Sequence, residues 1–380
     1  MVTQVAEINS GDINVTQKHL CFVGNMLGRN AGYITTQGEI LADLFTTEGY
    51  KITCVSSKIN RAARLAEIVK TLVKGCRAFD VVLLDTYSGL SFVIADLAGF
   101  LCKIFRLPLI MVLHGGNLPE FVQTHPRWAR RVLDRATILV APSEFLAKRF
   151  GVLGYRIPII PNIIDLDSYP FRERSRISPN LIWMRSFHEI YNPEMAVRVL
   201  ANLRATHPDA TLIMAGTDKG LEDGTRLLVE ELGLKGSVRF AGFLDLDKKL
   251  KEFAGADIYI NTTRIDNMPV SVVEARALGL PVVATNVGGL PHLIEHGKNG
   301  FLVPDEDVDA MAACIRMLLD SPELTRQISR NGRTLAERSA WTSVRPIWEK
   351  LIGEVIQNKT SKKAKVRGFT DKFSTEKIRN

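Results

Sequence analysis

The sequence predicts an α/β protein of two domains, each built on a parallel sheet with crossover helices. Its 380 residues exceed what one hydrophobic core usually accommodates and suit two domains of ordinary size. From residue 19 onward, short β-branched or apolar runs alternate with segments of helical periodicity, which is the pattern of parallel sheets. The 46% hydrophobic and 24% charged residues are ordinary globular values and exclude a disordered or collagen-like chain.

The expected strands fall into two series separated by a linker. The first series is 19–24, 50–56, 80–84, 108–114, 137–141 and 157–161, and the second is 181–185, 210–216, 237–241, 257–261, 281–285 and 300–303. Residues 165–179 are charged, contain two prolines and lack periodicity, so they mark the linker. Ligands of open α/β sheets bind beyond the carboxyl ends of the strands, so the residues after each strand are the first candidates for a site.

The two ends of the chain differ in composition from its body. Polar side chains interrupt residues 1–18, which predicts a flexible N-terminus without a secretory segment. Residues 359–380 hold eight Lys and Arg against two acidic residues, which predicts a basic disordered tail. This tail carries most of the formal net charge of +8, and the body lacks a basic motif with interleaved aromatic residues. A nucleic-acid partner is therefore not expected.

Metal, disulfide and membrane-spanning classes are also disfavoured. The five cysteines lie far apart in no ligand spacing, which indicates reduced thiols in a cytoplasmic protein. The D-x-D triplets are joined by no histidine or third carboxylate at ligand spacing, so we expect metal independence and no cofactor. Charged residues interrupt the most apolar region, 81–113, so no transmembrane helix is expected.

The segment 261–304 is the most specific part of the sequence. Asp266 and Asn267 are N-cap residues, Pro269 suits a first helical turn and Gly279 suits the position after a helix end. These signals predict a helix from about residue 269 to residue 278. The free N–H groups and positive dipole end at its start form a physical site for a diphosphate.

Two carboxylates accompany this predicted helix start. Glu274 lies about one and a half turns inside the helix, where it could accept hydrogen bonds from ribose hydroxyls. Asp266 stands eight residues earlier, where it would reach a sugar ring. The segment therefore favours a nucleotide-sugar site.

The pattern D-x7-E followed by ARALGLPVVA resembles the E-x7-E and E-A-x-A-x-G-x-P-V-V-A signature of family 4 glycosyltransferases, of the glycosyl transferase group 1 type. The resemblance implies a GT-B fold of two Rossmann-like domains facing across a cleft. It also implies a retaining enzyme that moves a sugar from a UDP or GDP sugar to a glycan, lipid-linked or small-molecule acceptor, in cell-surface polysaccharide or glycoconjugate synthesis. Asp266 stands where the family has Glu, which bears on the choice of sugar.

The resemblance also assigns roles to residues and domains. Asp266 would contact hydroxyls of the transferred sugar, and Glu274 would hold the ribose. The diphosphate would be held along the backbone of Asn267, Met268, Pro269, Val270 and Ser271. Residues 19–170 would form the acceptor domain and 171–340 the nucleotide-sugar domain, with a helix over 341–358 returning to the N-terminal domain.

Arg185 ends the first strand of the second series and matches the arginine of the family's G-R motif. A planar, permanently charged fork suits the neutralisation of a diphosphate. The family's lysine five or six residues later is replaced here by Ile190 and Tyr191. His188 is an alternative hydrogen-bond donor, and a structural loop histidine is the competing interpretation.

Two features of the first half complete the resemblance. His114 follows the fourth strand and matches the family's cleft histidine, which makes it a catalytic candidate with Arg185 and Asp266. Gly28 and Gly32 belong to a loop similar to the family's glycine-rich loop. A nicotinamide dinucleotide site would need G-x-G-x-x-G in this loop and an acidic residue at the end of the second predicted strand. Neither feature is present, so this kind of site is excluded.

Other functions of the same fold stay open. A catalytically silent nucleotide-sugar-binding subunit would account for Asp266 and the missing lysine, and a nucleotide-sugar epimerase would share the fold. A phosphorylase is disfavoured because no cofactor lysine is identifiable. The basic helical segment 58–79 and the run 127–131 suit peripheral contact with an anionic membrane, while an ordinary solvated helix face is the competing interpretation.

Overall fold

The computed structural model describes residues 17–28, 30, 33 and 35–360, without the side chains of residues 358–360. Most of the predicted flexible N-terminus 1–18, most of the basic tail 359–380 and Gly32 lie outside the described residues. Among the helices that are described, none combines the length and apolarity needed to span a bilayer.

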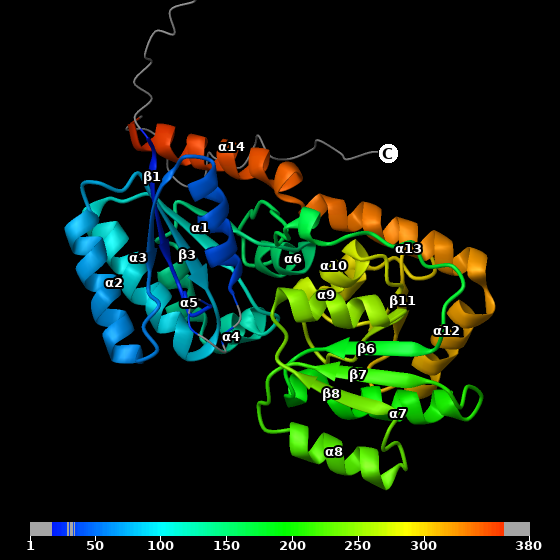
Figure 1. Cartoon of the computed structure of the whole chain (residues 1–380). Coiled ribbons are helices and arrows are strands. Elements are labelled where there is room, and N and C mark those ends of the chain that lie inside the picture. The colour runs from blue at the N-terminus through cyan, green and yellow to red at the C-terminus, as the bar shows by residue number, and fades with distance from the viewer. Residues whose placement is uncertain (1–16, 29, 31–32, 34, 361–380) are drawn as a thin grey trace, which may run out of the picture.

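Two parallel sheets organise the described chain, which confirms the predicted α/β class (Figure 1). The first has the strand order β2-β1-β3-β4-β5 and the second the order β11-β10-β9-β6-β7-β8. The strands are β1 His19–Val23, β2 Lys51–Val55, β3 Val81–Thr86, β4 Leu109–Leu113, β5 Ile138–Val140, β6 Asn180–Met184, β7 Thr211–Ala215, β8 Val238–Gly242, β9 Ile258–Asn261, β10 Val282–Thr285 and β11 Phe301–Val303.

Helices connect and cover these strands. They are α1 Gln37–Thr47, α2 Arg61–Gly75, α3 Phe92–Phe105, α4 Leu118–Thr124, α5 Pro126–Leu133, α6 Glu144–Gly151, α7 Pro193–Arg204, α8 Glu222–Glu231, α9 Leu246–Gly255, α10 Val270–Ala277, α11 Leu290–Leu293, α12 Val308–Asp320, α13 Pro322–Ala336 and α14 Trp341–Thr360. Short 3₁₀ turns occur at Gly89–Ser91, Leu166–Ser168, Glu189–Tyr191 and Glu337–Ser339.

The predicted strand 157–161 is wrong. This segment forms only an isolated bridge, between Ala141 and Ile159. Pro158 and Pro161 have no backbone N–H to give to a ladder, so an apolar run in this segment cannot extend the first sheet. Its chain instead leads from the edge of the first sheet toward the linker.

Both faces of the first sheet are covered, so each residue of β1 is buried. Alternate residues of β1 enter different cores, because successive strand side chains point to opposite faces. Cys21 and Val23 pack in the core beneath α2 and α3, and Phe22 packs in the core beneath α1 and α14.

Helix α14 follows α13 of the second half and lies along the first half in Figure 1. Val344, Trp348, Leu351, Ile352 and Val355 repeat at helical spacing and join the core that contains Phe22 and Phe45. The C-terminal helix therefore connects the two halves a second time, in addition to the linker.

Candidate functional site

Helix α10 begins at the carboxyl edge of the second sheet, after β9 and the loop 262–269. Pro269 is its N-cap residue, and no side chain caps the helix. The first N–H groups of a helix have no partner within it, and all α10 residues except Val270 are buried. The helix start therefore presents its positive dipole end in a setting of low dielectric.

The helix starts slightly later than its sequence signals indicate, and the predicted capping role of Asp266 and Asn267 is wrong. The Asp266 carboxylate instead accepts a hydrogen bond from the Asn267 N–H through Oδ1, at 2.8 Å. Its Oδ2 accepts from Arg185. Because the Asp266 carboxylate binds Arg185, it does not accept hydrogen bonds from the first turn of α10, and this turn has no side-chain cap.

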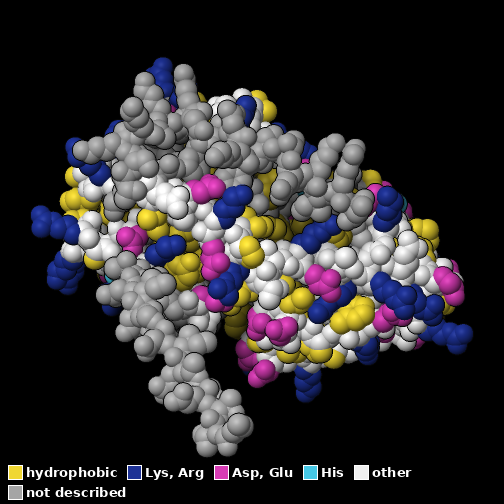
Figure 2. Space-filling model, turned by 90° about the horizontal axis from the view of Figure 1, so that it is seen from above, with side chains coloured by type: hydrophobic (Ala, Val, Ile, Leu, Met, Phe, Trp, Pro, Cys, Tyr) yellow, Lys and Arg dark blue, Asp and Glu magenta, His cyan; other side chains and the backbone are white. Residues whose placement is uncertain are grey.

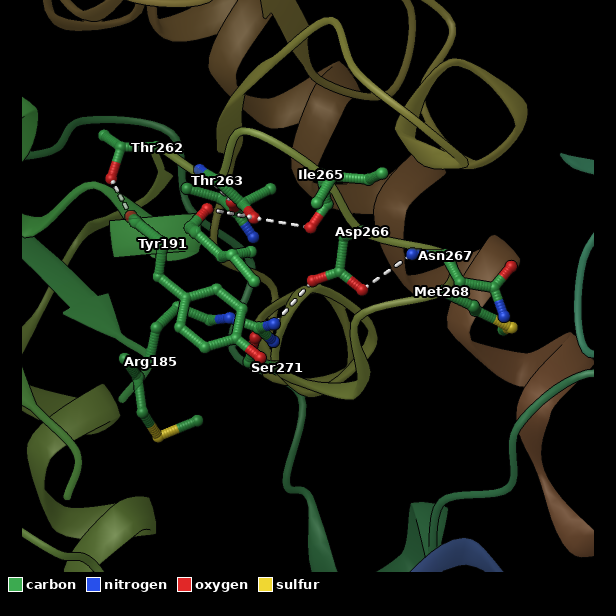
Figure 3. A network of polar contacts seen from close by, with 12 residues as sticks. Arg185, Tyr191, Thr262, Thr263, Ile265, Asp266, Asn267, Met268 and Ser271 are labelled. Atoms are coloured by element: carbon green, nitrogen blue, oxygen red, sulfur yellow. Dashed lines mark hydrogen bonds and ion pairs between the residues drawn. The ribbon is translucent and has the colours of Figure 1, made fainter. Parts of the chain in front are cut away.

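Arg185 directly follows β6 and forms an ion pair with Asp266, with 2.5 Å between Nη2 and Oδ2 (Figure 3). Both side chains are only 14% exposed. The guanidinium carbon lies 4.0 Å from the centre of the Tyr191 ring. The Arg185 Nε is buried and has no hydrogen-bond partner in the part of the chain that the structure describes. Burial lowers the pKa of Arg185, but Asp266 and Tyr191 outweigh it, so the net pKa is raised and the cation is retained.

Two glycines lie directly beneath the loop that carries Asp266. A Cβ on Gly289 would lie 1.7 Å from the Asn267 carbonyl oxygen, and a Cβ on Gly288 would lie 2.0 Å from that of Asp266. The Gly289 N–H donates to the Asp266 carbonyl at 2.9 Å. The loop can adopt this position only because neither residue has a side chain.

The first half of the chain contacts the same loop. A Cβ on Gly116, two residues after His114, would lie 3.1 Å from the Asp266 carbonyl carbon. The Ser143 hydroxyl, at the N-cap of α6, donates to Asn267 Oδ1. The loop 265–268 is therefore packed between the two halves.

Asn162 supplies another contact from the first half. Its Nδ2 donates to the Met268 carbonyl at 3.0 Å, and its backbone N–H approaches the Met268 sulfur at 3.4 Å. Met268 is itself buried. The backbone just before α10 is thus fixed by side chains and backbone of the other half.

His114 is buried after β4 and its ring is held on two sides. Its Nε2 lies 3.0 Å from Asp85 Oδ1, and the Tyr87 ring stacks on it with centroids 4.9 Å apart. Asp85 Oδ2 is buried and has no hydrogen-bond partner among the residues that the structure describes. Asp85 and His114 line a pocket that also includes Gln37 and Asn162. Asp85 was not identified from sequence, although it directly follows the predicted strand 80–84.

Glu274 is buried one turn further inside α10, and its carboxylate is already engaged. Oε1 accepts from the Tyr169 hydroxyl at 2.7 Å and from Lys249 Nζ at 2.6 Å. Nearby, the Tyr259 hydroxyl donates to Ser271 Oγ at 2.8 Å. Burial raises the pKa of Tyr259 to about 12, so this phenol stays protonated as a donor.

The remaining predicted residues serve local structure in the described chain. His188 Nδ1 accepts from the Ile190 N–H at 3.2 Å, at the start of the turn Glu189–Tyr191. The Gly28 N–H donates to Glu39 Oε2 at 3.2 Å, which ties the glycine-rich loop to the first turn of α1. The His188 ring also contacts the edge of the Tyr191 ring, with centroids 6.4 Å apart, and the Arg185 guanidinium lies over that ring. No contact among the described residues links Gly28 to the Arg185–Asp266 pair.

Most of the predicted site residues of the second half thus lie close together, at the carboxyl edge of the second sheet and the start of α10. They are Arg185, Asp266, Asn267, Met268, Pro269, Val270 and Ser271. Sequence reasoning missed Ser143, although it lies just after a predicted strand and its position was a usable signal. It also missed Lys249 and Tyr169, for which no local signal exists.

The glycine contact predicts the effect of one methyl group. Gly289→Ala should lower the melting temperature, because the added Cβ forces the loop at Asn267 to move and overpacking costs about 1–3 kcal/mol. The matched control is Gly224→Ala in α8, where an added Cβ meets no atom within 4 Å. This substitution should stabilise the helix, because alanine has a higher helix propensity than glycine. Thermal unfolding of both variants tests this. Equal melting temperatures would contradict the proposed close packing.

The second half of the chain is similar in sequence to known proteins. A sequence model of the family described as glycosyl transferases group 1 matches residues 175–335. The chain is 26% identical over 268 residues to glycogen synthase of Mycobacterium tuberculosis (strain CDC 1551 / Oshkosh), covering 66% of this chain and 63% of that protein. It is 29% identical over 248 residues to D-inositol 3-phosphate glycosyltransferase of Paenarthrobacter aurescens (strain TC1), covering 61% and 60%.

A solved structure extends the likeness to both halves. The crystal structure of Anabaena HepE in complex with UDP superposes with a TM-score of 0.69 at 21% identity, covering 89% of this chain and 100% of that one. The match to the curated relatives spans less than two thirds of their length, whereas this structural match covers both sheets. The chain accordingly has the GT-B fold, and its residues 175–335 match the sequence model of the glycosyl transferases group 1 family.

Proposed function

We propose that this protein is a glycosyltransferase that moves a sugar from a UDP or GDP sugar to an acceptor with retention of configuration. The main support is the Arg185 guanidinium, which is buried beside the uncapped start of α10 and keeps one N–H without a partner among the described residues. A buried cation and a helix N-terminus at one sheet edge both favour a diphosphate. Asp266 partly neutralises that cation, and the incoming phosphate oxygens would supply the missing acceptors.

Different residues are proposed to bind the different parts of the nucleotide sugar. Arg185 and the first N–H groups of α10 bind the diphosphate, and Glu274 binds the ribose. Asp266 and His114 both contact the sugar. They are close enough to do so because Gly116, two residues after His114, packs against Asp266. The Asp85 carboxylate and the Tyr87 ring hold the His114 ring in place. The acceptor would enter from the first half, where Asp85 and His114 line a pocket.

In this reaction the bond from the anomeric carbon to the phosphate oxygen breaks, and a bond to the acceptor oxygen forms on the same face. The departing phosphate takes the acceptor's proton. Arg185 and the start of α10 are aimed at the negative charge that develops on the leaving group, so they lower the barrier without moving. Fixing the loop 265–268 from both halves supplies the orientation that a bimolecular transfer needs. We propose that no metal ion takes part.

The named relatives support sugar transfer as the general activity. HepE binds UDP, and the curated relatives are named for glycogen synthesis and for transfer to inositol phosphate. By analogy we propose a role in polysaccharide or glycoconjugate synthesis in the cytoplasm. The second candidate is a silent nucleotide-sugar-binding subunit, favoured by Asp266 and by the aromatic Tyr191 in place of a lysine. Catalysed hydrolysis or transfer of a sugar separates the two.

Arg185→Ala should reduce nucleotide binding and turnover by roughly 10²-fold, the cost of one preorganised electrostatic group. Arg185→Lys should recover little, because an ammonium does not reproduce a bidentate fork. The measurement is binding of UDP and GDP by calorimetry with EDTA present, followed by single-turnover assays with UDP-glucose and GDP-mannose. Arg198→Ala, an exposed arginine of α7, is the matched control.

Circular dichroism reports folding of these variants, since removal of Arg185 leaves the buried Asp266 unpaired. A folded Arg185→Ala protein that keeps more than about a tenth of the wild-type rate would contradict the assignment. Nucleotide binding lost on addition of EDTA would contradict the metal-free mechanism.

We also propose peripheral contact with an anionic membrane through α2 and α3. Leu90, Phe100 and Ile104 are exposed at α3, and the segment 58–79 carries six basic residues against one acidic residue. Figure 2 shows Lys and Arg side chains beside exposed hydrophobic ones at the margin of the molecule. Apolar side chains flanked by cations suit an anionic lipid interface.

Flotation with phosphatidylcholine vesicles, with and without phosphatidylglycerol, tests this contact. Binding should require the anionic lipid and should fall several-fold in a Phe100→Ser/Ile104→Ser variant. Leu227→Ser changes an equally exposed leucine of α8 and should bind as wild type does. Equal binding of all three proteins to the anionic vesicles would contradict the proposal. Equal binding of the wild type to neutral and anionic vesicles would contradict it as well.

A further inference from the structure

Three distant segments meet at the carboxylate of Glu274. Lys249 comes from α9, Tyr169 follows the turn Leu166–Ser168 in the linker, and Glu274 lies in α10. Lys249 Nζ and the Tyr169 hydroxyl both donate to the same oxygen, Oε1, at 2.6 and 2.7 Å. The Glu274 and Lys249 side chains are 7% and 19% exposed. This is a buried, paired carboxylate of defined orientation.

The two donors differ in kind and complement one another. A buried carboxylate is costly without a cation or hydrogen-bond donors, and Lys249 supplies the cation. Burial, and then the charge of Glu274, raise the pKa of the Tyr169 phenol, so it remains a protonated donor. Because both bonds converge on Oε1, the rotation of the carboxylate is fixed. In the part of the chain that the structure describes, both hydrogen bonds of the Glu274 carboxylate go to Oε1 and leave its other oxygen, Oε2, available.

We propose that Lys249 and Tyr169 are positioning residues that make the site selective for ribonucleotides. They hold Oε1 so that Oε2 faces the nucleotide and accepts hydrogen bonds from the ribose hydroxyls. This inference rests on the proposed function, which assigns the ribose to Glu274. A site built to bind a hydroxyl rejects an analogue that lacks it, because its buried acceptor is then left unpaired.

The neighbouring lysine offers a matched control. Lys248 is 67% exposed and pairs with Asp245 at the start of α9, away from Glu274. It has the same charge and lies on the same helix as Lys249. Lys248→Met therefore reports any general effect of removing a positive charge from α9.

The test compares binding of a ribonucleotide with that of its 2′-deoxy counterpart. UDP and 2′-deoxy-UDP, or GDP and 2′-deoxy-GDP, are titrated into wild type, Lys249→Met, Tyr169→Phe and Lys248→Met. Wild type and Lys248→Met should prefer the ribonucleotide by at least tenfold. Lys249→Met and Tyr169→Phe should lose most of this preference through weaker ribonucleotide binding, with 2′-deoxynucleotide binding within about twofold of wild type. Lys249→Arg should restore it.

A purely structural role would weaken both nucleotides equally and leave the ratio unchanged, and that result would overturn the inference. An unchanged ratio in Tyr169→Phe, which loses only one hydroxyl, would overturn it even where Lys249→Met fails to fold. Wild-type protein that binds neither UDP nor GDP would instead refute the proposed function, and this inference with it. The two failures are therefore distinguishable.

Discussion

The buried ion pair between Arg185 and Asp266 is the interaction on which the site depends. Each group is nearly removed from water, so loss of either partner would leave the other as a buried, unpaired charge. The pair joins the end of β6 to the loop before α10, and thereby places a cation beside a helix N-terminus. The same pairing removes Asp266 from a capping role and leaves the start of α10 free.

The position of this loop is a second constraint, and it is shared between the halves. Gly288 and Gly289 let the carbonyls of Asp266 and Asn267 approach their backbone, while Ser143 and Asn162 hold the loop from the first half. A change in the angle between the halves would therefore be transmitted directly to the residues assigned to the diphosphate.

Sequence patterns predicted the sheets well because parallel strands buried on both faces are short continuous apolar runs, as in β3 and β4. The segment 157–161 is a similar apolar run but contains prolines. A prediction from the apolar pattern alone did not take account of these prolines and therefore assigned a strand there. Arg185 was identified at the end of a predicted strand and Asp266 before a predicted helix, and the structure pairs them. Their pairing could not be predicted, because it joins residues 81 positions apart. Likewise Lys249 and Tyr169 lie 25 and 105 positions from Glu274.

The central claim is that the start of α10 and Arg185 together form a diphosphate site. A crystal structure of the protein with UDP or GDP tests it most directly. The account predicts diphosphate oxygens within hydrogen-bond distance of the Arg185 guanidinium and of the Val270 or Ser271 N–H. A nucleotide bound with its phosphates away from both, for instance at the carboxyl edge of the first sheet, would contradict it.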